Sequence, residues 1–127
     1  MKVGALIEGE REIYEGGAVA TNDKITDVVL IASPEVMYDE RLKNIDEFIN
    51  EAGKACRGYR FHSGDVFSVT KEALAGVAAP VVGDIVELAK GTKLNVAKSA
   101  TSGSTVVGKI IAVEAAGRYT YYAIKID

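Results

Sequence analysis

Residues 103–110 read GSTVVGKI, and Gly103, Gly108 and Lys109 have the spacing of a phosphate-binding loop, G-x-x-x-x-G-K-[ST]. In such a loop a helix begins at the lysine, its free backbone N–H groups bind the phosphates, and the hydroxyl binds magnesium. Position 110 is isoleucine, and β-branched side chains dominate residues 105–113, which favours a strand over the start of a helix. We therefore predict a strand, with Gly108 at a bulge, a bend or a close approach of another backbone.

The single histidine, His62, and the single cysteine, Cys56, could form a thiol–imidazole nucleophile pair. No third group that would orient the histidine is evident, so we expect a structural histidine and an inert, buried cysteine. A metal site would need several His or Cys ligands, or an acidic loop such as D-x-D-x-D-G, and the sequence offers neither. The sequence thus predicts no catalytic residue, no cofactor and no metal, and we do not expect an enzyme.

The charge of the chain argues against a dedicated nucleic-acid-binding protein. Fifteen basic and eighteen acidic residues give a formal net charge of −3, and no basic stripe is visible. The lone cysteine cannot form an internal disulfide. No apolar run approaches the roughly 18 residues of a membrane span, and the first residues lack a signal-peptide pattern. We expect a soluble, intracellular protein without a membrane partner.

Strand signals dominate the chain, in segments joined by short glycine turns. The predicted strands lie at residues 25–32, 65–70, 85–88, 92–97, 105–114 and 118–126. One segment has helical periodicity, with Asn44 as its cap and Gly53 after its end. The sequence predicts a mainly β (α+β) fold: a small antiparallel β-barrel or sandwich with one short helix near 44–52 and an extended N-terminal arm.

This pattern predicts an N-terminal arm followed by a single domain. Residues 1–24, broken by several glycines, read as an N-terminal arm or hairpin. Residues 25–127 read as a single β-rich domain with a helical insert at about 35–57. An arm of this kind can add a strand to the open sheet edge of a neighbouring protein. We therefore expect residues 1–20 to form an intersubunit contact, with Val3, Leu6, Ile13 and Tyr14 as its apolar side chains.

The aromatic segment RYTYYAIKI is the second candidate for a binding surface. If it is a strand, Tyr122, Ile124 and Ile126 face one way, which is the better core face, and Tyr119 and Tyr121 face the other. Tyrosines on such a face can stack on bases or sugars, or lie in a protein interface. The net charge favours a protein interface, so Tyr119 and Tyr121 join the predicted interaction residues.

The phrases VGDIVEL, GTKLNV, VVGKIIAVE and GRYTYYAIKI, with the run YDERLKNIDEFINEAGKACRGYRFHSGDVFSVTKEAL, resemble small head proteins of tailed bacteriophages. These are decoration or cement proteins that stabilise the capsid. The resemblance implies a β-rich fold without catalysis, contacts with the major capsid protein, and homo-oligomers formed by copies of the chain. It also implies a location in the virion, after synthesis in the host cytoplasm.

Two alternatives to capsid decoration remain open from the sequence. The chain could be a small β-barrel module that binds a ligand or single-stranded nucleic acid through Tyr119 and Tyr121. It could also be a structural component at another place in the virion, such as the tail.

Overall fold

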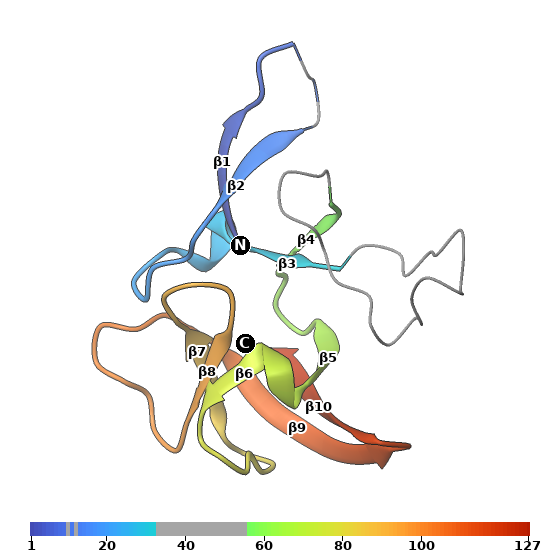
Figure 1. The fold of residues 1–127 in the computed structure, drawn as a ribbon. Helices are drawn as coiled ribbons and strands as arrows, with labels where there is room; N and C mark the ends of the chain where they lie inside the picture. The colour runs from blue at the N-terminus through green and yellow to red at the C-terminus, as the bar shows by residue number, and fades with distance from the viewer. Residues whose placement is uncertain (10, 12, 33–55) are drawn as a thin grey trace.

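The computed structural model describes residues 1–9, 11, 13–32 and 56–127, and this part of the chain is mainly β (Figure 1). Its helical content is limited to two short 3₁₀ segments, η1 (Ile25–Asp27) and η3 (Lys71–Ala73). The strands are, in chain order, β1 (Lys2–Leu6), β2 (Tyr14–Gly17), β3 (Val29–Ile31), β4 (Gly58–Arg60), β5 (Val66–Thr70), β6 (Leu74–Gly76), β7 (Ile85–Leu88), β8 (Leu94–Ala97), β9 (Val106–Ala116) and β10 (Tyr119–Ile126).

A six-stranded sheet in the order β5-β10-β9-β7-β8-β6 forms the body of the protein and curls into a half-barrel (Figure 1). Two separate antiparallel pairs, β1–β2 and β3–β4, complete the β-structure that the described residues form. The predicted small barrel or sandwich is therefore confirmed as a fold class. One detail differs, because β6 runs parallel to β8 while the other strand pairs of the sheet are antiparallel.

The long hairpin β9–β10 is the centre of this sheet. Its two strands are joined by Gly117 and Arg118, and Gly117 has a φ of 62°, a conformation that glycine adopts without strain. Side chains alternate as the sequence predicts, so Tyr122, Ile124 and Ile126 are all buried. With neighbouring valines, leucines and isoleucines they form the core: Val19, Val28, Leu74, Val86, Leu88, Val96, Val107, Ile110, Tyr122, Ile124 and Ile126.

The strand predicted at residues 25–32 is only partly correct. The first residues form η1, in which the N–H of Val28 donates to the carbonyl of Ile25 at 3.3 Å, and only Val29–Ile31 is a strand. Because the chain turns here, Ile25 packs against the core and Val28 lies within it. A continuous strand would point alternate side chains to opposite faces and could not place both residues in this way.

The predicted helix near 44–52 and most of the insert at 35–57 lie outside the described residues. The described residues on either side of this segment are paired with each other. The N–H of Ala32 donates to the carbonyl of Arg57 at 3.1 Å, which continues the β3–β4 ladder. Ala32 and Arg57 thus lie side by side.

Beneath the loop between β8 and β9 lies a buried carboxylate, that of Glu87, which is 1% exposed. It accepts hydrogen bonds from Thr101 Oγ1 at 2.6 Å, from the Thr101 N–H at 3.1 Å and from Asn95 Nδ2 at 2.9 Å. Burial alone would raise the pKa of Glu87, but the bonds from Thr101 and Asn95 outweigh it and hold the pKa below its usual value of 4.5. The network fixes the loop to the sheet.

We expect Glu87→Gln to lower the free energy of unfolding by about 1–3 kcal/mol near neutral pH, because an amide lacks the charge that strengthens these bonds and replaces one accepting oxygen with a donor. Since the pKa of Glu87 is lowered in the folded protein, ionisation stabilises the fold above about pH 4.5, and this contribution is lost as the pH falls through the folded-state pKa. The difference between the two proteins should therefore shrink in acid. Urea denaturation at a series of pH values measures it, and equal stabilities near pH 7 would contradict the assignment.

Candidate protein-binding site

The N-terminal hairpin, β1–β2, projects from the body of the protein (Figure 1). Leu6 and Tyr14 are paired across it, so their side chains share one face. Beyond this pair the N–H of Ile7 donates to the carbonyl of Ile13 at 2.9 Å, and Gly9, with a φ of 85°, lies in the turn. The apolar residues at the far end of the hairpin are thus brought together by backbone pairing.

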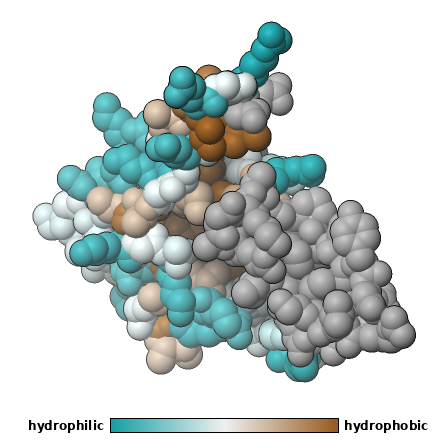
Figure 2. Space-filling view, turned by 45° about the horizontal axis from the view of Figure 1, so that its top comes forward, coloured by the Kyte–Doolittle hydropathy of each residue, from teal (hydrophilic) through white to brown (hydrophobic). Residues whose placement is uncertain are grey.

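This end of the hairpin exposes four large apolar side chains, which we call the tip cluster: Leu6 (45% exposed), Ile7 (39%), Ile13 (40%) and Tyr14 (50%). Figure 2 shows hydrophobic side chains gathered on this upper part of the molecule, between hydrophilic ones. No described residue before Val19 is buried, so the hairpin does not contribute to the core. A group of apolar side chains on a projecting element is typical of a protein interaction site.

The base of the hairpin is fixed to the body of the protein. The α-amino group of Met1 donates to the carbonyl of Val29 at 2.9 Å, and the N–H of Val29 donates to the carbonyl of Met1 at 2.9 Å. Burial lowers the pKa of the Met1 amino group. Lys2 Nζ lies 2.7 Å from Asp23 Oδ1, and this pairing raises the pKa of Lys2 and lowers that of Asp23. The hairpin is therefore held in place at its base, while its other end carries the exposed tip cluster.

The charge of the hairpin is acidic around the tip cluster. The segment LIEGEREIYE at residues 6–15 contains four glutamates and one arginine. Two of these four glutamates, Glu8 and Glu15, are among the described residues, and both are exposed. An apolar group flanked along the sequence by carboxylates favours a partner whose surface is apolar and basic.

The structure places the six predicted interaction residues in three different settings. Leu6, Ile13 and Tyr14 belong to the tip cluster, whereas Val3 lies opposite Gly16 near the hairpin base and is half-buried. Tyr119 and Tyr121 lie on β10 in the large sheet, away from the hairpin (Figure 1). The prediction omitted Ile7. In the structure its backbone pairs with Ile13, and this pairing places Ile7 in the tip cluster.

The two tyrosines of β10 have different surroundings. The guanidinium carbon of Arg118 lies over the ring of Tyr119, 5.1 Å from its centroid, and Arg118 Nη2 donates to Tyr119 Oη at 3.1 Å. Tyr119 is half-buried, while Tyr121 is exposed. Tyr121 is therefore the better placed of the two for contact with a partner.

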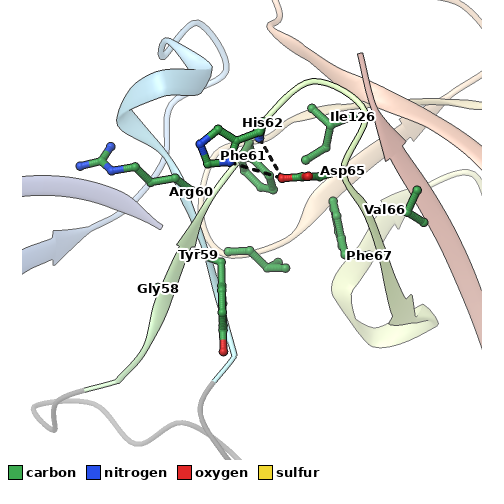
Figure 3. A pocket seen from close by; sticks show the side chains of 10 residues that line it. Gly58, Tyr59, Arg60, Phe61, His62, Asp65, Val66, Phe67 and Ile126 are labelled. Carbon is green, nitrogen blue, oxygen red and sulfur yellow. Dashed lines mark hydrogen bonds and ion pairs between the residues drawn. The ribbon is translucent and has the colours of Figure 1, made fainter.

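A hollow of about 490 Å³ lies between the β3–β4 pair and the start of β5 (Figure 3). The rings of Phe61 and Phe67, whose centroids are 5.7 Å apart, belong to its lining, as do His62 and Asp65. His62 Nδ1 is 3.4 Å from Asp65 Oδ2, and the His62 N–H donates to the same oxygen at 3.2 Å, so the carboxylate closes the turn between β4 and β5. Both side chains are exposed.

The structure also shows the setting of the cysteine and of the possible metal ligands. Cys56 is exposed and is not part of the core, so the expectation that it is buried was wrong. Across residues 1–9, 11, 13–32 and 56–127, no three His, Cys, Asp or Glu side chains are grouped so that they could hold a metal.

The segment whose sequence matches most of a phosphate-binding loop enters a strand, as predicted. Gly103 is in the turn before β9, and both Gly108 and Lys109 are within β9, paired with β10. A β-carbon at Gly108 would overlap the carbonyl oxygen of Lys125, so the glycine permits a close approach of the two backbones. Three residues later, Ile111 is the extra residue of a bulge, because Ile124 pairs with Ile110 and Ala123 pairs with Ala112.

Comparison with known proteins gave no relative that identifies the chain. No protein-family model matches it, and neither the curated proteins nor the solved structures contain a significant match. In the part of the chain that the structure covers, no helix has the length and apolar character needed to cross a membrane.

Proposed function

We propose that this protein is a non-catalytic structural protein of a virion, which decorates or stabilises a phage capsid by binding other protein through the tip cluster. The observation that carries the proposal is the projecting hairpin with Leu6 and Tyr14 paired and exposed at its far end. The major capsid protein as partner rests on the sequence resemblance to phage head proteins.

The geometry of the hairpin suits binding at low ordering cost. Its base is already fixed by Met1, Val29, Lys2 and Asp23, so docking does not have to immobilise a free chain. Fully burying a large apolar side chain is worth about 1.5–3 kcal/mol, so the tip cluster could supply a useful affinity before entropy costs. On a symmetric shell, oligomers would add further binding strength by avidity.

A shortened hairpin tests this proposal. Val3 and Gly16 are Cα partners, so residues 4–15 can be replaced by an Asn-Gly turn that leaves Lys2, Asp23 and the Met1–Val29 bonds intact. We expect the variant to fold and to lose binding to assembled capsids in a sedimentation assay. Undiminished occupancy of the shells would remove the hairpin from the proposed function.

A further inference from the structure

Two lysines face each other across the central strands of the large sheet. Lys109 on β9 and Lys125 on β10 are Cα partners, and their side chains lie on the face opposite the core, because Ile110, Ile124 and Ile126 are buried. Both lysines are exposed, and neither has an ion-pair partner among the described residues. Like charges directly opposite each other destabilise a sheet, so this pair has a cost that the described part of the chain does not offset.

Two exposed apolar side chains lie on the same face of the sheet as this pair of lysines. Val66 on β5 is the Cα partner of Lys125 and is 54% exposed. Tyr121 is four residues before Lys125 on β10, so its exposed side chain is on the same face. Its Cα partner on β9 is Glu114. We call Val66, Lys109, Tyr121 and Lys125 the lysine face; it is basic and apolar, the complement of the acidic and apolar tip of the hairpin.

We propose that the lysine face is the docking site for the hairpin tip of a second copy of this chain. This inference rests on the proposed function in one respect, since it takes the hairpin as the docking element. The negative charge of the incoming hairpin, to which Glu8 and Glu15 contribute, attracts Lys109 and Lys125, and the tip cluster packs on Tyr121 and Val66. The contact joins two different surfaces, so two copies can exchange hairpins in a two-fold dimer, or the contact can continue into a ring or a filament.

The charge of the chain favours this occupant over nucleic acid. A polyanion would also approach the two lysines, but the hairpin segment LIEGEREIYE and the net charge of −3 would repel it. A second copy supplies carboxylates, which attract the two lysines, together with apolar side chains, which can pack on Val66 and Tyr121.

A charge exchange tests the contact with two complementary variants of the full chain. The face variant is Lys109→Glu with Lys125→Glu, and the hairpin variant is Glu8→Lys with Glu15→Lys. All four side chains are exposed, and circular dichroism checks that both variants fold. Lys90→Glu with Lys93→Glu is the matched control, because it makes the same charge change at exposed lysines elsewhere.

Sedimentation velocity over a concentration series gives the result. The wild type and the control should self-associate, each variant alone should associate at least about tenfold more weakly because equal charges now meet, and an equimolar mixture should recover association. Self-association of the wild type should also weaken in high salt. Recovery in the mixture is specific to a contact between the hairpin and the lysine face, because each variant then offers the surface that the other needs.

Several results would overturn the inference. These are a wild type that stays monomeric at high concentration, variants that associate like the wild type, a mixture that does not recover, and an oligonucleotide that binds the lysine face of a monomer. If the wild type is monomeric but the shortened hairpin still loses shell binding, the inference fails and the proposed function stands. If the chain self-associates through these two surfaces but does not bind shells, the proposed function fails and the inference stands.

Discussion

Leu6→Ala combined with Tyr14→Ala should weaken binding to assembled capsids by about 100-fold, with little change in thermal stability. The two side chains are paired at the exposed end of the hairpin and are not part of the core, so their loss leaves the fold intact. Anchor residues of an interface typically cost about 2 kcal/mol or more when truncated, and 1.4 kcal/mol is a factor of about ten in affinity. Cosedimentation with shells at graded protein concentrations measures the change.

Val81→Ala combined with Val82→Ala is the control for this prediction. Both valines are exposed, at 50% and 60%, in the loop before β7, so the control removes apolar surface of a similar kind from another place. The control should bind shells like the wild type. If the Leu6 and Tyr14 variant also binds normally, the hairpin tip is not the contact, and its exposed side chains have another explanation.

Gly108→Ala should destabilise the protein by about 3 kcal/mol, at the upper end of the overpacking range, and lower the Tm by roughly 10–15 °C. The added β-carbon would overlap the carbonyl oxygen of Lys125 and lie 3.1 Å from the Cα of Ile126. Backbone atoms on both sides leave no side chain to move away, so β9 and β10 must separate. These strands form the middle of the sheet and contribute Val107, Ile110 and Ile124 to the core.

Gly17→Ala is the matched glycine control. An added β-carbon there meets nothing within 4 Å, and its φ is not in the left-handed region, so its effect should be under about 0.5 kcal/mol. Differential scanning calorimetry of both variants gives the comparison. A Gly108 variant that melts within about 2 °C of the wild type would show that the strands accommodate the methyl group. That result would contradict the close approach of the two backbones at this position.

Local patterns were sufficient to predict much of the large sheet. The apolar segment at 85–88 is β7, and the alternation in RYTYYAIKI correctly predicts Tyr122, Ile124 and Ile126 on the buried face. The pairing partners could not be predicted in this way. That β6 runs parallel to β8, and that residues 25–27 form a 3₁₀ turn, depends on contacts between distant segments.

The candidate site was only partly accessible from the sequence. Leu6, Ile13 and Tyr14 stand out because they are apolar residues among glutamates and glycines. Their grouping depends on the register of the hairpin, which also brings in Ile7. The lysine face could not be seen in the sequence, because Lys109 and Lys125 are opposite each other only through the bulged register of β9 and β10.

The most direct test of the central claim is the protein composition of purified phage particles that carry this chain. Quantitative mass spectrometry should find the protein in a fixed, stoichiometric ratio to the major capsid protein, and particles made with the shortened hairpin should lack it. Particles in which the protein is absent or present only in traces, while the free protein remains a monomer, would contradict the account.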